Sequence, residues 1–165
     1  MVVVRKATQH DFDFVYGLYM HPEANPFLLY EQMDKEEFKS VFDDLLQRDV
    51  KYIYESEGTP VGMFKLVPNV HRAGHVVYLG GLAVHPSFAG KGHGFTMMNE
   101  IIQYATQQGF LRIELSVAIS NVKAQRLYEK TGFGREGILR RLTYLRSENK
   151  MVDEVMMSWL NEKIK

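Results

Sequence analysis

The sequence predicts a mixed α/β fold, in which a mostly antiparallel sheet of six to seven strands is flanked by about four helices. Segments with the two-residue period of strands alternate with segments that have the helical period. The 165 residues, 45% of them hydrophobic and 24% charged, have the composition of one folded domain. No linker, low-complexity segment or repeat divides the chain, so we expect a single domain over residues 1–165.

The first half of the chain is expected to hold two helices and four strands. Residues 2–5 form a short strand, and residues 51–55, 61–68 and 75–84 form a meander. Thr8 caps a first helix that ends at His21-Pro22, with an apolar face made by Phe12, Val15, Tyr16 and Tyr19. Asp34 and Glu37 form a variant of the capping box, opening a second helix with Phe38, Val41, Phe42 and Leu45 on one face.

The second half is expected to hold two helices and three strands. A helix begins after Gly94, with an apolar face of Phe95, Met98, Ile102 and Ala105, and ends near Gly109. Residues 111–119 are a strand, residues 121–130 a helix, and residues 138–145 and 151–160 a final pair of strands. Gly80-Gly81 interrupts the apolar run 75–84, which predicts a bulge in this central strand, or a simple structural bend.

The charge balance and the absence of cysteine narrow the function classes. Twenty Lys and Arg residues balance twenty Asp and Glu residues, so we expect neither nucleic acid nor a membrane as partner. Without cysteine the chain has no disulfide and no thiolate zinc site, and we expect a cytoplasmic protein. His71 and His75 have helical i, i+4 spacing but no helix signal or carboxylate pair nearby, so we expect no metal site.

The segment between residues 84 and 94 is the most informative motif. Its three glycines, Gly90, Gly92 and Gly94, lie between a predicted strand and a predicted helix, where converging N–H groups and the helix dipole favour an anion. The segment is not Walker A, because Gly92 follows Lys91, and it is not the dinucleotide fingerprint, because Phe95 replaces its third glycine. A phosphate site is therefore expected, the alternative being a glycine-rich turn without a ligand.

Together with Asn121 and residues 127–133, this loop resembles the GNAT acetyltransferase superfamily. The family's pyrophosphate motif is Arg/Gln-x-x-Gly-x-Gly/Ala, and residues 89–94 match it except at Ala89. The resemblance implies a bulged GNAT fold and acetyl-CoA as co-substrate, with no metal. It implies that the diphosphate is held by backbone groups of Ala89, Gly90, Lys91, Gly92, His93 and Gly94.

The resemblance also assigns the rest of the coenzyme site. Leu82, Ala83 and Val84, after the bulge, would pair with the pantetheine arm as an added strand does. Asn121 would satisfy a polar group of the arm, the small Ala124 would leave room for it, and Lys130 would meet the outer phosphate. Tyr128 would be the general acid that protonates the departing thiolate, the alternative being a core aromatic residue.

The acceptor and the general base are less defined. An amine must be neutral to attack, and many relatives use a Glu on the bulged strand as the base, which is missing here. Tyr78 and His75 are the ionisable residues on that run. In the acidic connection 20–33, Glu23, Tyr30 and Glu31 would attract a cationic amine, or would simply be solvated.

The sequence thus predicts an N-acetyltransferase that moves an acetyl group from acetyl-CoA to a primary amine by direct attack in a ternary complex. The tail resembles the branch with ribosomal-protein N-terminal, amino-acid and polyamine acetyltransferases, so a small-molecule or peptide amine is the expected partner. Family habit alone suggests a homodimer. The alternatives are a non-catalytic acyl-CoA sensor and a nucleotide-phosphate module.

Overall fold

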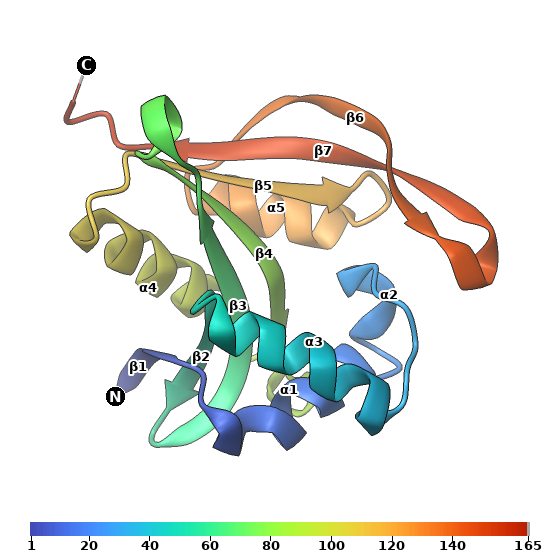
Figure 1. Cartoon of the computed structure of the whole chain (residues 1–165). Coiled ribbons are helices and arrows are strands. Elements are labelled where there is room, and N and C mark those ends of the chain that lie inside the picture. Colours follow the sequence, from blue (N-terminus) through green and yellow to red (C-terminus); the bar gives the residue numbers. More distant parts are fainter. Residues whose placement is uncertain (165) are drawn as a thin grey trace.

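The computed structural model describes residues 1–164, and seven strands form one sheet across it (Figure 1). The strands are β1 (Val2–Lys6), β2 (Lys51–Ser56), β3 (Thr59–Pro68), β4 (Val76–Val84), β5 (Arg112–Ala118), β6 (Gly134–Leu145) and β7 (Lys150–Leu160). Their order is β1-β2-β3-β4-β5-β7-β6, and β4 and β5 are the parallel pair in an otherwise antiparallel sheet. The predicted mixed, mostly antiparallel sheet is confirmed.

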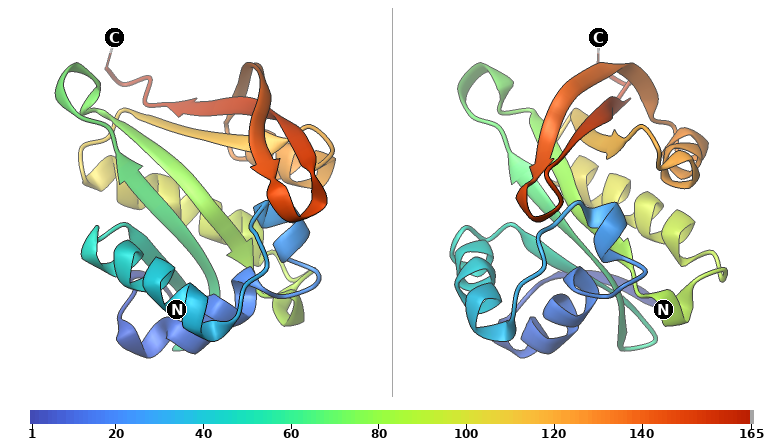
Figure 2. Two further views of the ribbon diagram at one scale, coloured as in Figure 1. Left: turned by 45° about the vertical axis from the view of Figure 1, so that its right-hand side comes forward. Right: turned by 90° about the vertical axis from the view of Figure 1, so that its right-hand side faces the viewer.

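Five helices connect these strands: α1 (Phe12–Tyr19), α2 (Asn25–Leu28), α3 (Lys35–Gln47), α4 (His93–Gln107) and α5 (Val122–Lys130). Figure 2 shows α1 and α3 on one side of strands β2 to β4, and α4 on the other. The side chains of β2 alternate accordingly: Ile53 packs with α1 and α3, whereas Tyr52 and Tyr54 pack in the core that contains α4. The sheet therefore has two buried faces, each with its own hydrophobic cluster.

The predicted cap of α3 is confirmed, whereas the predicted cap of the first helix is wrong, because Asp11 and not Thr8 is the N-cap residue of α1. Asp34 accepts a hydrogen bond from the Glu37 amide at 2.8 Å, and the Glu37 carboxylate accepts one from the Asp34 amide at 3.2 Å, so the capping box opens α3 as predicted. Thr8 begins a short 3₁₀ turn (Gln9–Asp11) before α1 starts. The Asp11 carboxylate accepts from the Thr8 amide and pairs with Arg5, both at 2.8 Å, which fixes this turn against β1.

Three details differ from the sequence prediction. The short helix α2 has Pro26 in its first turn and was missed, because four residues carry no periodic signal. On α4 the buried face is Met97, Met98, Ile101 and Ala105, whereas Phe95 is 46% exposed. Strand β6 starts at Gly134 instead of residue 138, because the register of β7 extends its pairing that far.

The centre of the sheet contains the feature that positions the site. Met63 pairs with Ala83 and Lys65 with Gly80, so Gly81 and Leu82 together lie opposite Phe64, and the predicted bulge in β4 is confirmed. Strands β4 and β5 pair only over Val76–Tyr78 and Arg112–Glu114. Beyond this short ladder the two strands diverge, so the bulged half of β4 has no strand partner on its β5 side.

Residues 1–164 contain neither a helix suited to a membrane nor a cluster of metal-binding side chains. None of the helices in this range combines the length and the apolar character that crossing a bilayer requires. Within the same range, no three His, Asp or Glu side chains are grouped so that they could hold a metal ion.

Candidate active site

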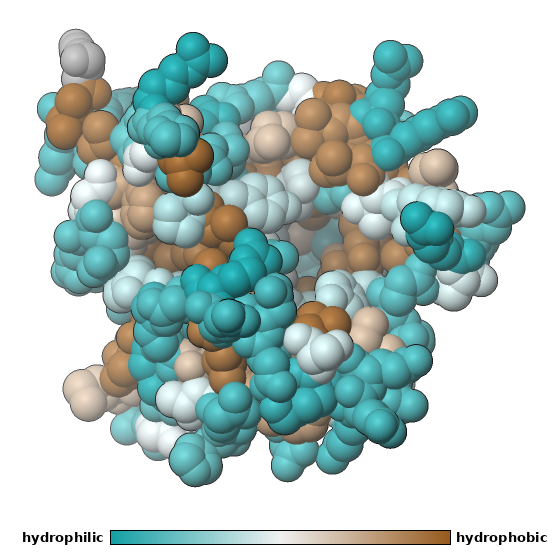
Figure 3. Space-filling model, viewed as in Figure 1, coloured by the Kyte–Doolittle hydropathy of each residue, from teal (hydrophilic) through white to brown (hydrophobic). Residues whose placement is uncertain are grey.

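A cavity of about 1310 Å³ opens along the gap between β4 and β5. Its walls are the bulged half of β4, the glycine loop with the start of α4, the end of β5 with α5, and the region around α2. The inner ends of β6 and β7 close it with Leu139, Thr143, Glu154 and Met156. Figure 3 shows the molecular face hollowed near its centre, with hydrophobic side chains beside the hollow.

The glycine loop delivers backbone donors to one end of this cavity. Gly92 precedes α4 with a φ of 81°, which places it in the left-handed region that favours glycine, and no side chain caps the helix. Gly92, His93, Gly94 and Phe95 all line the cavity, so the first turn of α4 directs its amides and positive dipole end toward this space. An anionic group suits this position.

The remaining loop residues divide into two groups. Ala89 and Gly90 line the cavity as predicted, and His93 lies 3.5 Å from the Tyr54 hydroxyl through its Nδ1. Lys91 is absent from the cavity lining; its Nζ lies 5.8 Å from the ring centre of Phe88 instead. Its side chain therefore has no place in the predicted cradle, which is made of backbone groups.

The gap itself is lined by Leu82, Ala83 and Val84 on β4 and by Val117 and Ala118 on β5. The β4 residues lie beyond the β4–β5 ladder, so an extended, amide-bearing ligand has room to pair with this strand edge. Both faces of the gap belong to one cavity that continues to the glycine loop. A ligand with a phosphate head and an amide-rich arm matches this sequence of donors.

Helix α5 forms the opposite wall with Asn121, Ala124, Tyr128 and Lys130, all of which line the cavity. The Asn121 side-chain oxygen accepts from the Ala124 amide at 3.2 Å and so caps α5, which leaves its Nδ2 to donate elsewhere. Tyr128 is 8% exposed. Burial, and then the neighbouring Tyr78, raise the pKa of Tyr128, so its hydroxyl keeps its proton at neutral pH.

Inside the cavity, three hydroxyl groups and one carboxylate are joined by hydrogen bonds. The Tyr78 hydroxyl lies 3.2 Å from Ser116 Oγ, and Ser116 Oγ donates to Glu154 Oε1 at 3.0 Å. Thr143 Oγ1 donates to the second oxygen, Oε2, at 2.6 Å. These four side chains come from β4, β5, β7 and β6, and all four line the cavity. Tyr78 was predicted here from the sequence, whereas Ser116 and Glu154 were missed.

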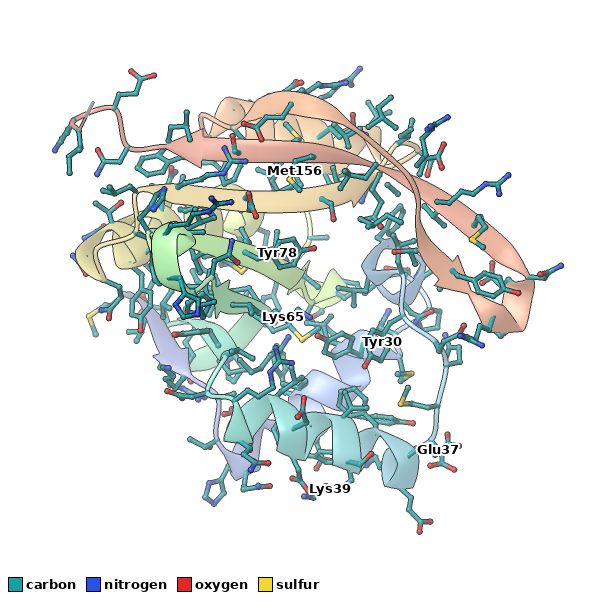
Figure 4. The ribbon with its side chains drawn as sticks, turned by 45° about the horizontal axis from the view of Figure 1, so that its top comes forward. Tyr30, Glu37, Lys39, Lys65, Tyr78 and Met156 are labelled. Carbon is teal, nitrogen blue, oxygen red and sulfur yellow. The ribbon has the colours of Figure 1, made fainter. Side chains whose placement is uncertain are left out.

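Two lysines that the sequence analysis did not identify lie beside the bulge. Lys51 on β2 is 1% exposed, pairs across the ladder with Lys65 on β3, and donates to the Tyr19 hydroxyl at 3.1 Å. Burial and then the neighbouring Lys65 lower the pKa of Lys51 well below its usual range, and burial also lowers the pKa of Lys65. Figure 4 shows Lys65 and Tyr78 on the same sheet. Lys65 and Tyr78 line the cavity, and so do Tyr19 and Tyr30.

The structure places the residues predicted to bind the acceptor in two different environments. Glu23 and Tyr30 line the cavity near α2, and their contact with an acceptor stays a prediction. Glu31 does not: its carboxylate accepts from the Arg146 amide at 2.5 Å and from the Ser147 amide at 3.3 Å, and it accepts from the Ser147 hydroxyl. Glu31 thus ties the connection before α3 to the β6–β7 turn, and these hydrogen bonds lower its pKa. The proposed acceptor contact of Glu31 is corrected.

His75 also requires correction as a candidate base. It is exposed and precedes β4 at the end opposite the bulge, and its backbone oxygen accepts from the Leu111 and Arg112 amides. It is not part of the cavity lining. Because a base must come within hydrogen-bond reach of the reacting amine, this placement removes His75 from the candidates.

Comparisons with known proteins agree with this geometry. The model of the Acetyltransferase (GNAT) family matches residues 7–133. An uncharacterized N-acetyltransferase of Methanocaldococcus jannaschii is 28% identical over 149 residues, which are 83% of this chain and 62% of that protein. Spermidine N(1)-acetyltransferase of Vibrio cholerae is 27% identical over 117 residues, which are 69% of this chain and 64% of that enzyme. The chain thus spans less than two thirds of these curated relatives.

Solved structures share the fold over almost the whole chain. The crystal structure of spermidine N-acetyltransferase from Vibrio cholerae in complex with CoA and spermine superposes with a TM-score of 0.83, at 22% identity, over 98% of this chain and 96% of that one. Ribosomal-protein-alanine N-acetyltransferase from Brucella melitensis gives 0.76, at 20% identity, over 96% and 99%. Since the family model covers more than half of the residues, the chain belongs to the acetyltransferase (GNAT) family.

Proposed function

We propose that this chain, as one domain, is an N-acetyltransferase that moves the acetyl group of acetyl-CoA to a primary amine. The observation that carries the proposal is the continuity of one cavity. Free amides at the start of α4, the unpaired edge of bulged β4 and the hydroxyl of the largely buried Tyr128 all face it. These groups fit the diphosphate, the pantetheine arm and the thioester sulfur of one extended ligand.

The coenzyme would be held mostly by backbone groups. The diphosphate meets the amides of Gly92, His93 and Gly94 at the positive end of α4. The arm pairs with Leu82 and Val84, and the side-chain amide of Asn121 donates to it from the opposite wall. Lys130 lines the outer part of the cavity, where it meets the remaining phosphate. No contact requires the side chain of Lys91.

Bound coenzyme supplies the activated acetyl group, and the protein supplies orientation and protons. Amides of the β4 edge are fixed donors that polarise the acetyl carbonyl as charge develops on its oxygen. Tyr128, which keeps its proton at neutral pH, donates it to the sulfur when the carbon–sulfur bond breaks. Both substrates share one cavity, which supports direct attack by the amine in a ternary complex.

The acceptor would enter from the side of α2, where Glu23 and Tyr30 line the wall. The names of the similar Vibrio cholerae and Brucella melitensis proteins give spermidine and a ribosomal-protein alanine as acceptors, and both are amines. They support an amine acceptor for this chain, either a small molecule or a peptide amino terminus.

Two measurements on the purified chain test this function. Calorimetry with coenzyme A and with ATP is expected to give a saturable signal for coenzyme A alone, since ATP lacks the pantetheine arm. A thiol-release assay with acetyl-CoA and a panel of polyamines, amino acids and short peptides is expected to find at least one amine that accelerates release. Binding without release for every amine would instead identify an acyl-CoA sensor, and no binding would refute the proposal.

A further inference from the structure

The cavity contains a carboxylate that the proposed coenzyme site does not use. Glu154 on β7 is 5% exposed, and hydroxyl groups donate to both of its oxygens, Ser116 at 3.0 Å and Thr143 at 2.6 Å. Among residues 1–164, no Lys, Arg or His side chain forms an ion pair with it. A buried carboxylate without a cation is costly in a folded protein, so its presence in a ligand cavity calls for a functional reason.

The alternation of strand side chains explains why Glu154 lies on the sheet face opposite the core that contains α4. Val155 and Met157 point into the core that contains α4, so Glu154 and Met156 point to the opposite face. The same alternation places Ser116 between the buried Leu115 and Val117, and Tyr78 between Val77 and Leu79. Figure 4 shows Tyr78 and Met156 with Lys65 and Tyr30 around this part of the molecule.

The chemistry of the proposed reaction requires a proton acceptor at this place. A primary amine with a pKa near 10 is almost entirely protonated at pH 7, and an ammonium ion has no lone pair with which to attack. Tyr128 donates a proton in the proposed function, so it cannot also remove this one. His75 lies outside the cavity. The hydroxyl chain that ends at Glu154 is a direct route from the cavity to a carboxylate.

On this basis, and resting on the proposed acetyl transfer, we infer that Glu154 is the general base, which takes the proton of the acceptor ammonium through the hydroxyls of Ser116 and Tyr78. The ammonium gives one proton to Tyr78 Oη, the Tyr78 proton moves to Ser116 Oγ, and the Ser116 proton moves to Glu154 Oε1. The two hydroxyls keep one proton each, Glu154 becomes neutral, and the amine gains its lone pair.

The remaining steps balance with the proposed transfer. The neutral amine forms the carbon–nitrogen bond, the carbon–sulfur bond breaks, and Tyr128 gives its proton to sulfur. The nitrogen then loses a second proton, which restores the phenol of Tyr128. Glu154 returns its proton to solvent after the amide leaves. Overall, an ammonium ion and acetyl-CoA become an amide, free coenzyme A and one proton.

The strands packed around Glu154 present few charged groups to it. β5 presents Ser116 to it and, two residues earlier on the same face of the strand, Glu114, which is held by Arg112 at 2.9 Å. β6 presents Thr143, while Arg140 and Arg141 are exposed. Across the gap lie Tyr78, Tyr128 and Lys65. A cationic Lys65 would lower the proton affinity of the acceptor amine and of Glu154 alike, so its charge gives no net preference for the direction of transfer.

The test is the pH dependence of kcat/KM for Glu154→Gln, with the amine that gives the fastest thiol release in the panel. The substitution preserves the size of the side chain. We expect a loss of about 10²- to 10⁴-fold at pH 6.5, the usual scale for a general base. The loss should shrink steadily toward pH 9, because solvent then supplies the neutral amine. Ser116→Ala and Tyr78→Phe should show smaller losses with the same pH trend.

Glu136→Gln is the matched control. Glu136 on β6 is also a carboxylate that accepts from a serine, Ser158, but it is not part of the cavity lining, so its variant should keep the wild-type profile. Coenzyme A affinity, measured by calorimetry, should stay within about twofold in every variant, since none of these side chains is assigned to the coenzyme.

Several results would overturn the inference. A Glu154→Gln enzyme with wild-type kcat/KM would do so, as would a loss that is the same at every pH or a rise in KM with kcat unchanged. The last result would make Glu154 a binding group for the ammonium. If the wild-type chain binds coenzyme A but releases thiol with no amine, the proposed function fails first, and this assignment fails with it.

Discussion

The proposed coenzyme side of the cavity and its proposed acceptor side, next to α2, are built on different principles. The proposed coenzyme side uses two continuous segments: residues 82–94, which offer backbone groups, and residues 121–130, which offer the side chains of Asn121, Tyr128 and Lys130. The acceptor side uses side chains from strands and helices that are far apart in the sequence, including Tyr30, Lys65, Tyr78 and Glu154. A backbone site depends on local conformation, whereas a side-chain site depends on how the sheet aligns its strands.

The two sides also differ in their electrostatics. The amides at the start of α4 are neutral donors that remain available without any charged partner. On the acceptor side, Lys51 and Glu154 are almost fully buried, and neither forms an ion pair within residues 1–164. Burying such groups costs folding free energy. On the acceptor side, we therefore expect substitutions that remove a buried charge to raise stability and lower activity.

The sharpest test of the coenzyme side is Tyr128→Phe. Removing the hydroxyl should lower kcat by about 10²-fold or more while coenzyme A affinity stays nearly unchanged, because only the proton donated to sulfur is lost. Steady-state kinetics and calorimetry measure the two effects. Tyr104→Phe on α4 is the control, since its hydroxyl lies 3.5 Å from that of Tyr52, outside the cavity. Unchanged turnover in Tyr128→Phe would remove this residue from the mechanism.

The boundary between the two sides is tested by Gly81→Ala. Gly81 has a φ of 53°, and an added Cβ would lie 2.6 Å from the Tyr19 hydroxyl and 3.2 Å from Lys51 Nζ. We expect about 1–2 kcal/mol of backbone strain and a loss of kcat/KM of about tenfold or more, as the bulge shifts. Gly58→Ala has similar strain but open space around it, so it should lose stability and keep its activity. Equal activities in the two variants would contradict this role of the bulge.

The substitution Lys51→Met tests how much folding free energy the burial of this charged group costs. The folded pKa of Lys51 lies below its unfolded value, so the unfolded chain binds more protons between the two values and stability rises with pH there. The groups that face Lys51 are Tyr19 and Lys65, with Tyr30 beyond them. Methionine should raise the free energy of unfolding at pH 7 by the order of 1 kcal/mol, and it should remove that part of the pH dependence.

Denaturant unfolding at several pH values measures the effect of Lys51→Met. Lys39→Met on α3 (labelled in Figure 4) is a control, because Lys39 is exposed and pairs with Asp43, so its change should stay within about 0.5 kcal/mol. A Lys51 variant that is less stable than the wild type at pH 7 would mean that its hydrogen bond to Tyr19 outweighs the cost of burial.

The smallest effect is expected for Glu31→Ala. Its carboxylate holds the Arg146 and Ser147 amides at the β6–β7 turn, so hydrogen exchange of these two amides should become faster. In the wild type this contact persists above the unfolded pKa of Glu31, and it weakens as the pH falls through the lowered folded value. Coenzyme A affinity should not change. Glu148→Ala, at the same turn, should leave the exchange of both amides as it is; if it accelerates them equally, the contact is not specific to Glu31.

Much of the fold and of the coenzyme side could be read from local patterns. The capping box at Asp34 and Glu37, the double glycine in β4 and the glycine loop before α4 each act through residues adjacent in the sequence. Such signals report backbone conformation directly. The misplaced apolar face of α4 and the missed helix α2 show the limit: a stripe of apolar residues does not say which side the sheet will cover.

The sequence alone predicted the order of the seven strands and of four of the five helices, and the bulge in β4, because these depend on glycine, capping residues and short-range periodicity. Only the tertiary structure decided which side chains meet at the acceptor side. Strand register joins Tyr78, Ser116 and Glu154 across β4, β5 and β7, and it leaves His75 and Glu31 outside the cavity. The physical reason is that strand pairing brings together residues from distant parts of the chain, and no local pattern encodes which of them will face the same space.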